Sequence, residues 1–284
     1  TLVVAGLYAL LSLYEATADR VYTIGIALFI IKIGLTFKDV AGDGLTVETF
    51  NEKEGPNAAA GLGIGGFLAG MFVIGGLGVF YDQSDWSVTM LVIAGAAILM
   101  TLPAMVTPER PAAAARAKAL EEGRRASFIA IFRRKETPGV MIITSSRGFV
   151  EHMVPVMAPV FLLDLGYSLT EIGVVMGISV ILAGIAGNIF CAYLLNRFTE
   201  RLAIIITTIL AIIGTVPLII LAIVGDDPGY TAVIITMTLA VFGNQPQATL
   251  VFAFRMKWTS KTQAGTDFGM QSAFRSIGNS IGIG

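Results

Sequence analysis

Charged and polar side chains stand at helical spacing inside several long apolar stretches of this sequence. Lys32, Thr36, Asp39 and Asp43 are spaced i, i+4, i+7 and i+11, which places them on one face of a helix. Two carboxylates one turn apart repel each other, and a proton bound by either one relieves the repulsion. The spacing predicts proton binding at Asp39 and Asp43. It equally fits a cytoplasmic gate in which basic loop residues hold the pair.

A second group combines an arginine with titratable neighbours. Arg147 and Glu151 are one turn apart, and His152 follows directly. One interpretation is a titratable Glu151 whose pairing with Arg147 changes as a cavity opens, with His152 in a proton relay. The alternative is an ion pair that only offsets its own burial, beside a histidine that packs between helices.

Two further polar groups lie toward the end of the sequence. Asp267, Gln271, Arg275 and Asn279 repeat every four residues and form a stripe, whose first member also fits a helix cap. Asn244 and Gln245 precede Pro246, where a broken helix would expose carbonyl groups to a cavity. A charge at membrane depth costs at least ~2.5 kcal/mol, so such residues tend to face a cavity or a partner. We therefore expect a polar path, with these candidates for binding a solute: Lys32, Arg147, Asn244, Gln245, Gln271 and Arg275.

The elements that position these residues are long apolar helices. Of the 284 residues, 55% are hydrophobic and 14% charged, and mean hydropathy is +0.78. Soluble domains carry about 25% charged residues, so this composition indicates an all-α polytopic membrane protein. A spanning helix needs about 20 apolar residues. The stretches that meet this length, some of them cut short, are 1–14, 21–50, 57–80, 86–107, 138–163, 170–195, 202–224, 230–254 and 263–284.

The connections between these stretches differ in charge. Alternate connections hold fourteen Lys and Arg residues against one, and the positive-inside rule places the basic set in the cytoplasm. The basic connection 108–137 is the only long one. It divides the chain into an N-terminal bundle of four helices, 1–107, and a C-terminal bundle of five, 138–284. Within it, Phe128, Ile131 and Phe132 stand between basic clusters, which fits a segment in the membrane interface as well as a solvated linker.

Other features exclude several classes of protein. Cys191 and His152 are the only residues of their kinds, so we expect no disulfide, no metal site and no cofactor. A net charge of −1 does not favour nucleic acid. The glycines from Gly61 to Gly66 formally match G-x-G-x-x-G, but they lie in an expected span. We expect them to form close helix contacts instead, through Gly61 with Gly65 and Gly66 with Gly70.

Three segments resemble a known family of permeases. The stretch 38–47, KDVAGDGLTV, looks like the fourth helix of AmpG-type permeases. The stretch 161–175, FLLDLGYSLTEIGVV, is similar to that family's link between helices 7 and 8. The stretch 262–268, TQAGTDF, is similar to the entry into helix 11 of siderophore permeases of the RhtX/FptX type. The resemblance implies the major facilitator fold, with two six-helix bundles of which this sequence holds helices 3 to 11.

Together these observations predict a proton-coupled secondary transporter that works by alternating access. The resemblance implies uptake of a medium-sized, partly anionic solute, such as a muropeptide or a siderophore, across a bacterial inner membrane. The proton-site candidates are Asp39, Asp43, Glu151 and His152. We expect a monomer, with lipid, protons and the solute as its partners. Two alternatives from other classes are an intramembrane enzyme and a membrane sensor that does not transport.

Overall fold

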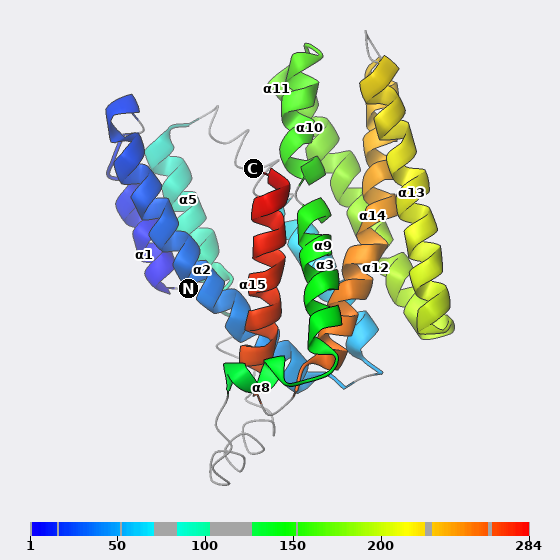
Figure 1. Ribbon diagram of the computed structural model, residues 1–284. Coiled ribbons are helices and arrows are strands. Elements are labelled where there is room, and N and C mark those ends of the chain that lie inside the picture. The colour runs from blue at the N-terminus through cyan, green and yellow to red at the C-terminus, as the bar shows by residue number, and fades with distance from the viewer. Residues whose placement is uncertain are drawn as a thin grey trace.

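The chain folds into long helices that run side by side (Figure 1). The computed structural model describes residues 2–15, 17–51, 53–70, 84–102, 127–151, 153–224, 229–260 and 263–283, and these residues contain no strand. Each stretch expected from hydropathy is helical over most of its described residues, although α1 ends at Leu11 and α5 at Leu99, before the ends of the stretches 1–14 and 86–107. The helices are α1 (Leu2–Leu11), α2 (Val21–Thr49), α3 (Gly55–Gly70), α5 (Trp86–Leu99), α8 (Phe128–Phe132), α9 (Thr137–Glu151), α10 (Met153–Asp164), α11 (Leu169–Val174), α12 (Val180–Arg197), α13 (Glu200–Val224), α14 (Tyr230–Trp258) and α15 (Ala264–Ile283).

The two sets of connections lie at opposite ends of the helices, as the alternation of charge predicts. At the weakly charged end, the Trp86 indole N–H donates to the carbonyl of Leu11 at 3.0 Å, which joins the end of α1 to the start of α5. At the basic end, the Asn196 amide donates to Asn57 Oδ1 at 2.7 Å. Figure 1 shows α8 at this same end, beside the start of α15. We refer to it below as the cytoplasmic end, which is the orientation that the positive-inside rule predicts.

Apolar side chains cover much of the outer surface. On α13, Ile209, Ile213 and Ile223 are 51%, 61% and 78% exposed. Judged by length and composition alone, two helices in the described residues could cross a membrane, Thr170–Arg197 and Glu200–Ile223, while Leu2–Leu11 and Trp86–Leu99 are apolar but shorter. A surface of this kind is stable only in an apolar environment, which is the expected property of a membrane protein.

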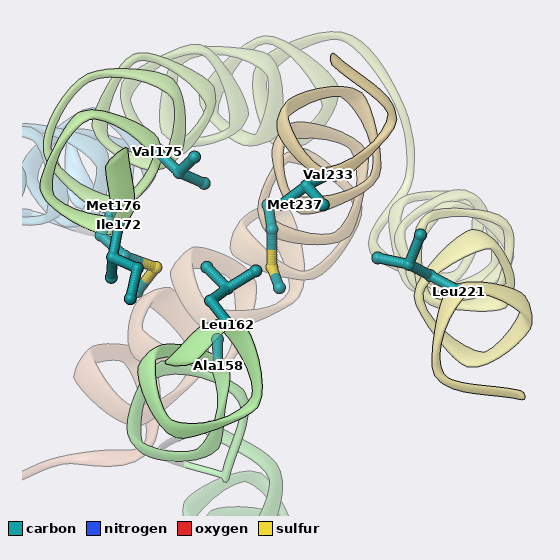
Figure 2. Packing of buried hydrophobic residues seen from close by; sticks show 8 residues of the cluster. All are labelled: Ala158, Leu162, Ile172, Val175, Met176, Leu221, Val233 and Met237. Carbon is teal, nitrogen blue, oxygen red and sulfur yellow. The ribbon is translucent and has the colours of Figure 1, made fainter. Parts of the chain in front are cut away.

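A buried apolar cluster joins four helices near the weakly charged end (Figure 2). Figure 2 shows Leu162 of α10 and Met237 of α14 pointing toward each other, with Leu221 of α13 to one side. Between α11 and α12 the chain forms one π-helical turn, Val175–Ser179, which adds Val175 and Met176 to the cluster. This core packs α10, α11, α13 and α14 together as one unit.

Two expectations for α14 are wrong. The helix is not broken at Pro246 but runs unbroken from Tyr230 to Trp258. Pro246 is buried, and a Cβ added at Gly187 of α12 would stand 3.1 Å from its ring. Close packing against α12 therefore surrounds α14 at the proline, where the helix continues. Arg255, counted above among the loop cations, lies inside α14 and is only 2% exposed.

Close contacts between helices use other glycines than those expected. Gly61, Gly65 and Gly66 have open space where a Cβ would stand, so the contacts predicted through these three glycines are wrong, while the surroundings of Gly70 lie outside what the structure describes. The tightest contact joins α9 and α15. A Cβ at Gly278 would collide with the carbonyl of Ser145, and one at Gly148 would collide with the carbonyl of Arg275. The two backbones touch because these positions lack side chains.

At the cytoplasmic end, α2 and α15 are in close contact. A Cβ on Gly44 would stand 3.0 Å from the Cα of Gly265, and Gly269 lies against Val40 one turn further. Val47 joins Phe268 in a buried apolar cluster at the same place. Two helices far apart in the sequence therefore meet near the cytoplasm.

The end of the 108–137 connection is docked on the protein rather than free in solvent. Residues 103–126 lie outside the described residues. In α8, Ile131 is only 6% exposed, so the expectation that it lies in the membrane interface is wrong. Phe132 is 55% exposed, and its place in the interface stays a prediction. Arg134, just after α8, forms a two-fold ion pair with Asp267 of α15, with N–O distances of 2.5 and 3.3 Å.

Candidate functional site: a basic cavity between the helices

A cavity of about 280 Å³ lies where α3 meets helices of the segment 138–284. Its position follows from packing. The α9–α15 glycine contact holds these two helices together, and α3 packs against α12 and α14. The side chains around the remaining gap define the cavity. Its lining residues are Ala59, Leu62, Gly63, Gly66, Thr144, Arg147, Asn188, Gln245, Ala248, Thr249, Val251, Phe252, Arg255 and Arg275.

Asn188 of α12 is the buried centre of the hydrogen bonds in this cavity. It is completely buried, and its amide donates to the carbonyl of Gly184 at 2.9 Å. Its Oδ1 accepts from the Thr249 hydroxyl at 2.5 Å and from the Gln245 amide at 3.3 Å. Buried amides must be hydrogen-bonded to be stable, so these bonds fix the orientation of all three side chains. Asn188 was not among the residues predicted to form a site, although a polar Asn in an otherwise apolar run of the sequence is a signal for one.

Gly63 makes room for the Asn188 amide, so a larger residue at this position should destabilise the protein. A Cβ at Gly63 would overlap the side chain of Asn188, which cannot turn away without losing its bonds. We expect Gly63→Ala to lower the free energy of unfolding by about 2 kcal/mol, the cost of disturbing a buried polar group. Thermal unfolding in detergent measures this. Gly65→Ala, at a glycine with open space in the same helix, should change it little, and equal effects of the two would contradict the interpretation.

Arg255 occupies the cytoplasmic edge of the cavity and is held by α15. Its guanidinium donates to Gln271 Oε1 at 3.2 Å and to the Ser272 hydroxyl at 2.7 Å. The guanidinium carbon lies 4.1 Å from the centre of the Phe268 ring, which gives a cation–π contact. Arg255 therefore joins α14 to α15 while its charge stays beside the cavity.

The structure brings together some of the candidate solute-binding residues and separates others. Arg147, Gln245 and Arg275 line the cavity. Gln271 lies behind it, where it accepts from Arg255 and donates to Thr259. Asn244 points to α13 and donates to the Thr215 hydroxyl at 3.0 Å.

The proton-site candidates are also distributed. Asp39 is exposed beside Lys38, with an N–O distance of 3.8 Å, and Lys32 is exposed on the same helix. Asp43 is half-buried, and the charges of Arg255 and Arg275 act on its carboxylate. The side chain of Glu151 and the whole of His152 lie outside what the structure describes.

Within the described residues, no three His, Cys, Asp or Glu side chains gather where they could hold a metal ion. The polar side chains that line the cavity are instead arginines, amides and hydroxyls. Such a set binds anionic and hydrogen-bonding groups directly.

A helical protein with an apolar outer surface and polar side chains inside it belongs to the class of polytopic membrane proteins. The family model of the Major Facilitator Superfamily matches residues 1–283. The chain therefore belongs to the major facilitator superfamily, which is a family of multi-pass membrane transporters. Among curated proteins, none matches the sequence.

Proposed function

We propose that the chain is a proton-coupled secondary transporter that takes up a partly anionic solute by alternating access. One observation carries the proposal: three arginines line a single cavity and none of its described lining residues is acidic. Cations at membrane depth are costly unless an anion or a polar partner stabilises them. A solute anion entering this cavity would add to the stabilisation that these arginines already receive from their partners in the protein.

The packing at the cytoplasmic end supports alternating access between the N-terminal bundle (1–107) and the C-terminal bundle (138–284). In this conformation the α2–α15 contact at Gly44 and Gly265 would close the route to the cytoplasm. This contact has backbone atoms on both sides and so depends on small residues, which lets the two bundles separate without breaking strong bonds. Uptake would require this contact to open after the solute has bound.

Asp43 supports the coupling to protons. It stands on α2, opposite the cations Arg255 of α14 and Arg275 of α15, with Asp39 one turn away on its own helix. A proton on Asp43 removes a negative charge that attracts Arg275, and Arg275 can then attract the solute more strongly. Because such coupling is reciprocal, proton and anion each favour binding of the other.

Reconstituted vesicles test this proposal. We expect an inward acid gradient to drive uptake of labelled muropeptides or ferric siderophores. In Asp43→Asn the gradient should lose its effect while exchange of solute across the membrane continues, since only the proton site is removed. Glu200→Gln, at an exposed carboxylate 55% accessible to solvent, serves as the control. Uptake indifferent to the gradient in the unchanged protein, or an Asp43→Asn variant that still responds to it, would overturn the coupling.

The cavity volume bears on the kind of solute. At about 280 Å³ it is at the small end of the range for ligand pockets, which begins at about 300 Å³. A muropeptide or a siderophore would place only its anionic end here in this conformation.

A further inference from the structure

The lining of the cavity is rich in hydrogen-bond donors. Arg147, Arg255 and Arg275 can only donate, because a guanidinium group has no acceptor atom. Whatever these arginines bind, they cannot serve the N–H and O–H groups of a solute. Such groups lose their hydrogen bonds to water when the solute enters, so each needs an acceptor in the protein.

Side-chain acceptors that a solute could reach are fewer. Thr144 and Thr249 line the cavity, but these residues are only 0% and 3% exposed. Asn188 is completely buried, and its Oδ1 already accepts from Thr249 and from Gln245. Gln245 is half-buried and lines the cavity, so its side-chain oxygen is the acceptor within reach of a solute.

Hydrogen bonds fix the orientation of the Gln245 amide. The carbonyl of Gly184 can only accept, so Asn188 must turn its nitrogen toward it, at 2.9 Å. Asn188 Oδ1 then faces Gln245 at 3.3 Å. An oxygen cannot donate, and Gln245 must therefore present its own nitrogen there. The reversed amide would set two oxygens against each other.

This orientation turns Gln245 Oε1 away from Asn188. The nitrogen and oxygen of a planar amide lie on different sides of its carbon, and the nitrogen is held by Asn188. No residue that the structure describes donates to Gln245 Oε1, whereas the Gln245 backbone carbonyl accepts from Thr249. A solute N–H or O–H group could pair with this oxygen. A methyl group in the place of that hydrogen would leave the oxygen without a donor and cost binding free energy.

We infer that Gln245 selects solutes that carry a hydrogen-bond donor, and that its Oε1 is the atom that accepts from them. This inference rests on the proposed function and deepens it, because it narrows the partly anionic solute to one that also carries an N–H or O–H group. Two groups share this chemistry, an amide N–H and a hydroxyl.

Equilibrium binding to the purified full chain in detergent tests this selectivity with two pairs of small carboxylates. N-acetylglycine has an amide N–H, and N-acetyl-N-methylglycine has a methyl group in its place. Glycolate has a hydroxyl group, and methoxyacetate is its methyl ether. We expect at least one of the donors to bind at least about tenfold more tightly than its methylated counterpart, and the pair with the larger ratio identifies the group. Equal affinities within both pairs, or no binding of any probe, would overturn the inference.

Three variants connect this ratio to the Gln245 oxygen. Gln245→Leu has no acceptor, so the ratio should fall to about twofold, whereas steric exclusion of the methyl group alone would leave it unchanged. Gln245→Glu keeps an acceptor and should keep a ratio of at least about tenfold, since its added charge acts alike on both carboxylates of a pair. Gln247→Leu is the same substitution at a half-buried position of α14 outside the cavity lining, and it should keep the ratio. A ratio that survives in Gln245→Leu, or disappears in Gln245→Glu, would contradict the role of the oxygen.

Failure of this inference and failure of the proposed transport have different signatures. Proton-driven uptake into vesicles by a protein without any donor preference would overturn only the inference. A donor preference that depends on Gln245, in a protein that shows no uptake, would support the inference and overturn only the proposed transport.

Discussion

We expect the Arg134→Gln variant to lose about 3 kcal/mol of its free energy of unfolding, the lower end of the range for breaking a buried ion pair. The loss is large because the partner, Asp267, has a side chain only 2% exposed and would lose the cation that forms its ion pair. The Arg134 side chain is 31% exposed, which is why the lower end of the range applies. Thermal or denaturant-induced unfolding of the full chain in detergent measures the loss.

Substitution of the two partners of this ion pair should lower the free energy of unfolding by unequal amounts. Asp267→Asn should cost less than Arg134→Gln, because the amide oxygen can still accept from the backbone N–H of Ser260, which lies 2.9 Å from the Asp267 carboxylate, and Arg134 can turn toward solvent. The double variant should therefore be more stable than Arg134→Gln alone. Lys257→Gln provides the matched control, since the Lys257–Glu200 pair has side chains 45% and 55% exposed and such pairs contribute about 0–1 kcal/mol. Strictly additive effects of the two changes would show that the pair is not coupled.

Gly278→Ala should be about as destabilising, for a steric rather than an electrostatic reason. The added methyl group would collide with the backbone carbonyl of Ser145, and backbone atoms cannot move aside as a flexible side chain can. The helices α9 and α15 must then separate, which removes the bond from Ser145 to Phe274 and shifts Arg147 relative to Arg275. We expect a loss of about 3 kcal/mol, the upper end of the range for overpacking. Unfolding in detergent measures it.

A control on a neighbouring helix separates this effect from a general intolerance of alanine. Gly139 of α9 is exposed, with no atom within 4 Å of its Cβ position, so Gly139→Ala should leave the free energy of unfolding nearly unchanged. A Gly278→Ala protein as stable as Gly139→Ala would contradict the close backbone contact.

Asp267 and Gly278 both belong to α15, and contacts along this helix position it beside the cavity. Asp267 anchors its cytoplasmic end to the segment after α8, and Gln271 anchors the next turn through Arg255. Of the residues in α15, Arg275, two turns above Asp267, is the one that lines the cavity. The first two residues of the polar stripe, Asp267 and Gln271, thus hold α15 in place, and the third, Arg275, lines the cavity.

The sequence by itself predicted the helices and their alternation, because these depend on local properties, and its motifs predicted the superfamily. Apolar length defines a helix such as Glu200–Val224 without reference to any neighbour, and the charge of each connection distinguishes the two ends. The basic character of the cavity was also predictable, since Arg147 and Arg275 are conspicuous in apolar surroundings. The division into the bundles 1–107 and 138–284 stays a prediction.

What only the tertiary structure decided is which face of each helix meets which neighbour. Gly61 and Gly278 look alike in the sequence, yet only Gly278 lies where a second backbone arrives. Asn244 and Gln245 are adjacent, yet they point to α13 and to the cavity, because successive residues in a helix project about 100° apart. Arg255 stands in the last turn of its helix, where sequence alone suggests a loop cation, but packing against α15 buries it. Spacing along the chain places side chains on faces, and only the packing of distant helices determines what each face binds.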